Sequence, residues 1–255
     1  MYANYHTHTK RCQHAVGEDR EYVEAAIRGG MKVLGFSDHC PYIFPDNYVS
    51  NCRMTPNMLE EYIDSVLQLK KEYADDINIY LGLECEYVPE LLEAQNAFLK
   101  DYPIDYKILG EHFVYAEPHG AYMGAPVDDE IILTEYVDLC IEALETGQYI
   151  YLAHPDLVNF TGSYEVYAKH MRRLCHYLKD KELPVEINLL GYYDKRHYPC
   201  DRFLRIAQET GVAKAIVGVD AHSPERLEMV DVQKECEHLA IKYGMTVMDS
   251  IPGLD

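Results

Sequence analysis

Two histidines near the start of the chain, His6 and His8, have a spacing that suits metal binding. In an extended strand, side chains alternate between the two faces, so residues i and i+2 point the same way. Two neutral imidazoles on one face can bind the same metal ion. Two histidines near a terminus can equally be exposed side chains without a ligand, and the spacing alone does not decide between these interpretations.

Further residues of this chemistry follow the short apolar segments that we expect to be strands. In parallel strands these ends lie at one edge, where chain-distant side chains meet. Any one of these residues alone is best explained as a hydrogen-bonded strand-end side chain. Together they favour a metal site, since imidazole and carboxylate form the ligand set of Zn, Mn and Fe. Cys12, Cys40 and Cys85 follow no ligand pattern. The residues at these ends are His6, His8, His39, Glu84, His112, His154, Asp220 and His222.

The strands that would position these residues alternate with amphipathic helices. Apolar runs separated by helices predict a parallel sheet covered on its faces. Such units close most simply into a β/α barrel, and the alternative is an open doubly wound sheet. No linker or repeat interrupts the pattern, so we expect one domain over residues 1–255. The predicted strands are 2–8, 33–37, 77–83, 106–109, 149–153, 184–187 and 215–219, followed by a helix over 225–243 and a tail over 244–255.

Composition limits the classes of partner. The 255-residue chain has a net charge of −20, which argues against nucleic acid because phosphate contacts need clustered Lys and Arg. No apolar run is long enough for a membrane span, and residues 1–10 lack a signal-peptide pattern. The eight Cys contain no CxxC pair and are expected to be reduced thiols in the cytoplasm. A small-molecule ligand is therefore expected, and a homo-oligomer stays open.

The motifs around these residues resemble the PHP (polymerase and histidinol phosphatase) superfamily along essentially the whole chain. Within it, the chain looks most like the monofunctional histidinol-phosphate phosphatases of histidine biosynthesis. One departure is Leu189-Leu190, which follows the predicted strand 184–187. Related phosphatases usually carry small polar residues at this place. The motifs are His6-x-His8, His14, Ser37-Asp38-His39, Gly82-Leu83-Glu84, His112, Ala153-His154-Pro155-Asp156 and Asp220-Ala221-His222.

This resemblance implies a distorted seven-stranded (β/α)7 barrel of the PHP type, with a cluster of up to three divalent ions of Zn, Mn or Fe. Glu84 and Glu86 share a strand face, and spacing alone does not choose between them, whereas the resemblance implies Glu84 as the bridging ligand. The implied sets are His6, His8, Glu84 and Asp220 for the first ion, Glu84, His112 and His154 for the second, and His14, His39 and His222 for the third.

The implied activity is hydrolysis of L-histidinol phosphate by a metal-bound hydroxide. No Ser, Cys or Asp lies in a recognisable phosphate-loop motif, so we expect no phosphoenzyme. The alternatives are a PHP phosphoesterase for another small monoester or a phosphotyrosyl peptide, and a non-catalytic metal-binding module. The net charge of −20 disfavours a nuclease.

The remaining catalytic candidates are less fixed by spacing. Asp156, His197 or a metal-bound water are candidates to protonate the leaving alkoxide, although Asp156, like Asp38, is better placed to orient an imidazole. Arg196 is the first candidate to bind the substrate phosphate, and Arg53 is its rival. An exposed basic loop residue explains either arginine equally well.

Overall fold

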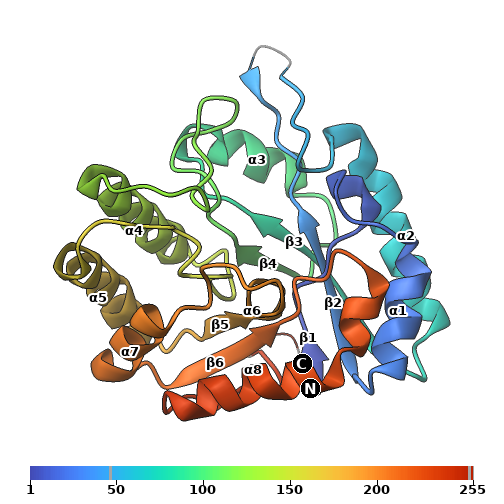
Figure 1. The fold of residues 1–255 in the computed structure, drawn as a ribbon. Helices are drawn as coiled ribbons and strands as arrows, with labels where there is room; N and C mark the ends of the chain where they lie inside the picture. Colours follow the sequence, from blue (N-terminus) through green and yellow to red (C-terminus); the bar gives the residue numbers. More distant parts are fainter. Residues whose placement is uncertain (46–47, 252–253, 255) are drawn as a thin grey trace.

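The strands of the computed structural model, which describes residues 1–45, 48–251 and 254, form two parallel sheets. Single bridges from Leu152 to Leu109 and to Val185 connect the two sheets. A third bridge, Thr7–Ala221, joins the segment after the first strand of the chain to the segment after the sixth. The strands therefore curl around a common centre (Figure 1). One sheet has the order β1 (Ala3–Asn4), β2 (Val33–His39), β3 (Asn78–Cys85) and β4 (Tyr106–Leu109), and the other has β5 (Val185–Asn188), β6 (Lys214–Gly218) and β7 (Thr246–Val247).

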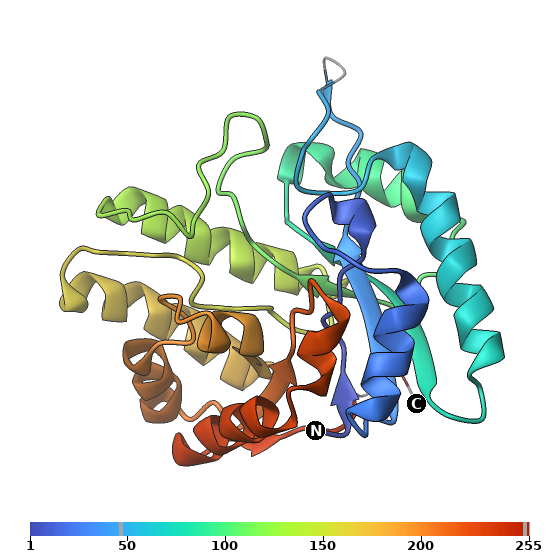
Figure 2. The same cartoon turned by 45° about the vertical axis from the view of Figure 1, so that its right-hand side comes forward.

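Helices surround the strands on the outside (Figures 1 and 2). Several begin where the sequence supplies a capping side chain; the Ser163 hydroxyl, for example, accepts the Val166 N–H. The α-helices are α1 (Asp19–Arg28), α2 (Leu59–Glu72), α3 (Leu92–Leu99), α4 (Glu130–Glu145), α5 (Tyr164–Asp180), α6 (Leu189–Tyr193), α7 (Asp201–Thr210) and α8 (Val230–Lys242). Short 3-10 helices are η1 (Lys10–Cys12), η3 (Pro56–Met58), η4 (Pro89–Leu91) and η5 (Pro224–Glu228).

The predicted α/β class with parallel strands is confirmed, but several segments differ from the prediction. The strand expected over 2–8 is reduced to β1 and a single bridge at Thr7. Residues 149–153 contribute only the bridges at Leu152 instead of a strand. The tail contains β7, which pairs with β6. The helix expected over 225–243 is divided, because Met229 has a non-helical backbone between η5 and α8.

Two groups of buried apolar residues form on the two faces of the strands. Along β4, Leu109 belongs to the larger group, which includes helix residues, whereas its neighbour Ile108 belongs to the smaller one. Successive strand side chains point to opposite faces, so the smaller group fills the inside of the curl. Its largest members are Tyr5, Tyr106 and Tyr151.

Tyr106 fixes the interior of the curl. Its buried hydroxyl has one proton to donate and lies 2.8 and 3.0 Å from the carbonyl oxygens of Tyr5 and Phe36. A side chain at Gly82 would place its Cβ 2.4 Å from the Tyr106 ring, so glycine leaves the room that the ring occupies. This contact ties the start of β4 to the middle of β2 and to the residue after β1.

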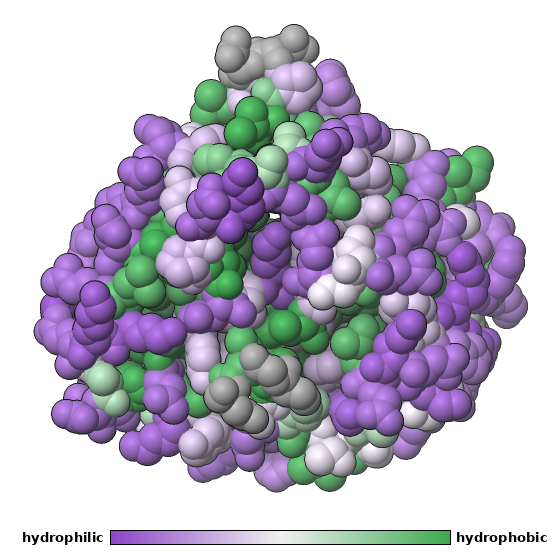
Figure 3. Space-filling view, turned by 180° about the vertical axis from the view of Figure 1, so that it is seen from behind, coloured by the Kyte–Doolittle hydropathy of each residue, from purple (hydrophilic) through white to green (hydrophobic). Residues whose placement is uncertain are grey.

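The outer surface is mostly polar. From behind, hydrophilic residues form most of the outline, and apolar residues gather in patches between them (Figure 3). Within residues 1–45, 48–251 and 254, no helix has both the length and the apolar character that crossing a membrane requires.

We predict that Tyr106→Phe lowers the free energy of unfolding by about 1–3 kcal/mol, because it leaves buried carbonyls without their donor. Urea unfolding followed by circular dichroism measures the change. Tyr2→Phe, at a ring that is 49% exposed, serves as the control and should leave stability unchanged. Equal stability of the two variants would contradict this account of the core.

Candidate metal centre

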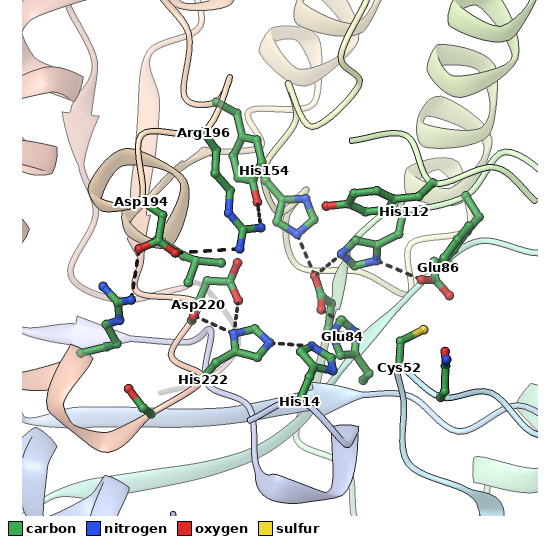
Figure 4. Close-up of a pocket in the computed structure, with 18 residues that line it drawn as sticks. His14, Cys52, Glu84, Glu86, His112, His154, Asp194, Arg196, Asp220 and His222 are labelled. Atoms are coloured by element: carbon green, nitrogen blue, oxygen red, sulfur yellow. Dashed lines mark hydrogen bonds and ion pairs between the residues drawn. The ribbon is translucent and has the colours of Figure 1, made fainter. Parts of the chain in front are cut away.

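Residues that follow different strands converge on one cavity of about 570 Å³ (Figure 4). Glu84 comes from β3 and His154 from the segment after the Leu152 bridge, and both line its wall. His6 and His8 are fully buried, with ring centroids 5.1 Å apart. Their imidazoles share one side of the segment after β1, as the spacing predicted. The other predicted ligands that line the cavity are His14, His39, His112, Asp220 and His222.

The Glu84 carboxylate is the centre of this cluster and is 1% exposed. Its Oε1 lies 3.0 Å from His154 Nε2 and 3.4 Å from His6 Nε2. Its Oε2 lies 3.0 Å from His39 Nδ1 and 3.6 Å from His8 Nε2. The two oxygens thus face two different pairs of imidazoles, which is the arrangement that a carboxylate bridging two cations needs.

Asp220 lies beside the two N-terminal histidines. Its Oδ1 is 3.1 Å from His8 Nε2 and 3.6 Å from His6 Nε2. The candidate ligand atoms of these three residues all lie within 4.8 Å of one another. They match three of the four residues that the resemblance implies for the first ion.

A second compact group contains His14, His39 and His222, again with ligand atoms within 4.8 Å of one another. It matches the set implied for the third ion. His112 is less central, with its Nε2 3.7 Å from Glu84 Oε1. In the compact groups Glu84 and His154 are joined by His6 rather than by His112, so the set implied for the second ion is reproduced only in part.

Most of the imidazoles are held from behind through Nδ1. Because an ionised carboxylate only accepts hydrogen bonds, an Nδ1 beside one carries the proton, and Nε2 is left with its lone pair toward the centre. Backbone carbonyls act in the same way on His14 and His222, at 2.8 and 3.1 Å. The carboxylate contacts are His6 to Glu186 at 2.7 Å, His112 to Glu86 at 2.9 Å and His8 to Asp38 at 3.5 Å.

The inward-facing atoms lack hydrogen-bond partners among the described residues. They are His6 Nε2, His8 Nε2, Glu84 Oε2 and Asp220 Oδ1, all buried. At the mouth, the Nε2 atoms of His14 and His222 face each other at 2.9 Å. With Nδ1 of both rings donating to carbonyls, these are two lone pairs pointing at one place. Such an arrangement fits a cation, because buried polar atoms without partners are otherwise costly.

The electrostatics of the cluster also favour positive charge. Burial lowers the pKa of His8, but the nearby carboxylates of Asp220, Asp38 and Glu84 outweigh it and raise that pKa to about 9. Burial raises the pKa of Glu84, yet the surrounding histidines hold it well below its ordinary value. Farther out, burial and the neighbouring charges of His222 and His8 lower the pKa of His14 to about 4. The donor types and their charge balance therefore fit Zn, Mn or Fe.

Arg196 is the predicted arginine that lines the cavity. Its Nη1 donates to the Tyr198 hydroxyl at 3.1 Å, and its Nη2 lies 3.9 Å from Asp194. Asp194 also pairs with Arg226 at 3.1 Å, a second arginine of the wall that sequence reasoning missed. Leu190, the departure noted in the sequence, lines the same cavity.

The other predicted residues have partners elsewhere. The Asp156 carboxylate accepts the Cys200 N–H at 2.6 Å, and His197 Nε2 lies 2.6 Å from the Leu157 carbonyl oxygen. Burial raises the pKa of Asp156 to about 6. Arg53 is 2% exposed and bound to Glu86 and Glu117 at 2.7 and 2.6 Å. None of these three predicted residues is among the described lining of the cavity.

Glu186 and Asn188 were missed as candidates, although they contact the cluster directly. Glu186 holds His6, and Asn188 Nδ2 donates to Asp220 Oδ2 at 3.1 Å. The sequence did carry a signal, because Glu186 interrupts the apolar predicted strand 184–187 and Asn188 follows that strand, two residues farther on. In a buried strand such a pair points to one face and needs polar partners there.

Comparisons with known proteins show a family and similar folds. The family model described as PHP domain matches residues 4–189. The chain is 29% identical over 228 residues to a probable histidinol-phosphatase of Deinococcus radiodurans, covering 86% of this chain and 85% of that protein. The fold matches the histidinol phosphate phosphatase of Lactococcus lactis, solved with zinc, L-histidinol and phosphate, with a TM-score of 0.76 and 22% identity over 100% of this chain and 98% of that one. It also matches a structure of metal-dependent tyrosine phosphatases from Bacillus subtilis and Streptococcus pneumoniae, with a TM-score of 0.50 and 13% identity over 96% of each chain.

We predict that a chelator lowers the melting temperature and that Zn²⁺ or Mn²⁺ restores it. A ligand at a hundred times its dissociation constant stabilises the folded state by about 2.7 kcal/mol. Differential scanning fluorimetry of chelated and reloaded protein measures the shift. Asp220→Asn should show a smaller rise on reloading, because it removes one anionic donor. A melting temperature insensitive to chelator and to every divalent ion would exclude a metal centre.

Proposed function

The chain belongs to the PHP domain family, and on this basis we propose that it is a metal-dependent phosphomonoesterase. The substrate we propose is L-histidinol phosphate, hydrolysed to L-histidinol and phosphate in histidine biosynthesis. Support comes from similarity to a probable histidinol-phosphatase over 86% of the chain. We further propose that residues 1–255 form one domain, a distorted seven-stranded (β/α)7 barrel.

The observation that carries the proposal is the Glu84-centred cluster on the wall of an open cavity. We propose that divalent cations are held there by the nine predicted residues. Such cations supply an activated water as nucleophile and neutralise charge on the phosphoryl oxygens. The residues proposed to hold them are His6, His8, His14, His39, Glu84, His112, His154, Asp220 and His222.

Arg196, which lines the cavity, is proposed to bind the substrate phosphate. The Tyr198 hydroxyl and Asp194 orient its guanidinium. Arginine matches the geometry of phosphate oxygens and stays charged at every physiological pH. The same residue would neutralise charge that accumulates during phosphoryl transfer.

Asp156 and His197 are proposed to act on the loop that carries Arg196 and not on substrate. Asp156 holds the Cys200 N–H and His197 the Leu157 carbonyl, so the two residues fasten the loop after α6 to the segment after His154. In the lining of the cavity, Leu190 offers an apolar surface that suits one face of an imidazole ring.

We expect the metal-loaded protein to hydrolyse L-histidinol phosphate faster than other monoesters. The test measures phosphate release from a panel that includes phosphoserine, glycerol phosphate and a phosphotyrosyl peptide. Preference for the phosphotyrosyl peptide would replace the proposed substrate and keep the reaction class.

Glu84→Ala and the isosteric Glu84→Gln should each lose at least about 100-fold in kcat/KM, the scale of removing one group that stabilises charge. Circular dichroism establishes whether each variant is folded. Retained hydrolysis in a folded Glu84→Gln protein, or no hydrolysis of any monoester by wild type, would contradict the proposal and favour a non-catalytic metal-binding module. A trapped covalent phosphoprotein would contradict direct attack by water.

Arg196→Gln should lower kcat/KM about 10- to 100-fold, because a hydrogen bond to a charged group contributes about 1.5–3 kcal/mol. The matched control is Arg205→Gln on α7, whose side chain is exposed and pairs with Asp201. Steady-state kinetics of both variants measures the difference. Equal activity of the two would remove Arg196 from the proposed site.

A further inference from the structure

Glu186 is a completely enclosed carboxylate in the middle of β5, 1% exposed. It does not line the cavity among the described residues, so it is not placed to touch a substrate. Burial of a carboxylate is costly unless hydrogen bonds satisfy both oxygens. Each oxygen of Glu186 accepts hydrogen bonds, and these bonds connect the carboxylate, directly or through one further side chain, to different residues of the cluster.

Glu186 Oε1 accepts from His6 Nδ1 at 2.7 Å. This bond assigns the Nδ1 proton and orients the ring, so that Nε2 points to Glu84 at 3.4 Å and Asp220 at 3.6 Å. His6 Nε2 is buried and has no hydrogen-bond partner of its own among the described residues. The direction of the His6 lone pair thus depends on Glu186.

Glu186 Oε2 accepts from the His154 backbone N–H at 2.8 Å and from Asn188 Nδ2 at 2.9 Å. Asn188 Nδ2 also donates to Asp220 Oδ2 at 3.1 Å. The backbone of both ligand candidates is in the left-handed region, with φ of 30° at His154 and 52° at Asp220. Residues without glycine's freedom hold such a conformation only when their surroundings fix it.

The neighbouring strand leaves room for this carboxylate. Asn188 and Gly218 are paired in register between β5 and β6. A Cβ on Gly218 would lie 1.8 Å from Glu186 Oε1, the atom that holds His6. The glycine is therefore required by the position of the carboxylate, which is a second and independent sign that this position is built into the fold.

We propose that Glu186, together with Asn188, is a positioning residue that sets His6, His154 and Asp220 in one arrangement for metal binding. The inference rests on the proposed metal centre but not on the identity of the substrate. In this proposal one side chain in β5 orients candidate ligands from three segments, which follow β1, Leu152 and β6. Loss of Glu186 should therefore weaken metal binding without touching the substrate pocket.

Glu186→Gln tests the inference with almost no change in volume. The amide cannot accept from His6 Nδ1 and also accept at its other end from the His154 N–H and Asn188, so one donor must lose its partner. We expect zinc affinity to fall about 10- to 100-fold, the effect of changing a residue that orients a metal ligand. Competition with a chromophoric chelator measures the affinity without substrate.

Glu111→Gln is the matched control. Glu111 is fully buried, and its Oε2 accepts only the backbone N–H of Tyr87 among the described residues. Zinc affinity should stay at the wild-type value in this variant. Glu186→Asp separates charge from position, since it keeps the charge but is one methylene too short to reach all three donors. Zinc affinity should fall in this variant too, and wild-type affinity would assign the effect to charge alone and overturn positioning.

A measurement on the wild type keeps the inference testable if the variants do not fold. In zinc-loaded, ¹⁵N-labelled protein, the His6 Nδ1 proton should give a slowly exchanging downfield resonance, because it is buried and bonded to a carboxylate. Absence of this resonance, or wild-type zinc affinity in folded Glu186→Gln, would overturn the proposal. Failure to hydrolyse histidinol phosphate would leave these two readouts unaffected, so the two hypotheses fail separately.

Discussion

The site depends on burying the Glu84 carboxylate. Removing a carboxylate from water is unfavourable unless positive charge or donors surround it. Five imidazoles have a ring nitrogen within 4 Å of its two oxygens, supplied by His6, His8, His39, His112 and His154. No short segment of chain can bring so many rings to one point. The curl of the parallel strands brings these rings together, and the rings offset the unfavourable burial of Glu84.

The same curl explains why the site lies at one end of the strands. Register pairs His39 of β2 with Glu84 of β3, so the two C-terminal strand ends lie at one level. Tyr106 and its apolar neighbours fill part of the interior below that level. Side chains that follow the strands therefore meet at the C-terminal ends of the strands, and the cavity forms there.

The sequence was enough to predict residues whose role follows from their own strand. It was not enough to predict contacts between polar groups from distant segments. His8, Glu84 and Asp220 were recognisable because each lies at the end of a predicted strand and carries the chemistry of a ligand. Arg53 was assigned a role by its charge alone, whereas its real partners, Glu86 and Glu117, come from distant segments. Residues 149–153 read as a strand by apolar content, yet only Leu152 forms bridges. Glu186 and Asn188 stand out as a polar pair at i and i+2, but the sequence does not show which chain-distant groups they contact, so Glu186 was not singled out.

Each imidazole held by a carboxylate is connected to a further group that neutralises or satisfies that carboxylate. Behind His112, Glu86 is paired with the buried guanidinium of Arg53. Behind His8, Asp38 accepts from the Thr9 hydroxyl, which in turn accepts from Arg11 Nη1 at 3.1 Å. Behind His6, the other donors to Glu186 among the described residues are the His154 backbone and Asn188, which are both neutral. Among these residues Glu186 thus lacks a guanidinium partner of the kind that Glu86 has in Arg53. Its negative potential falls on the His6 ring, where it strengthens the basicity of Nε2 toward a cation.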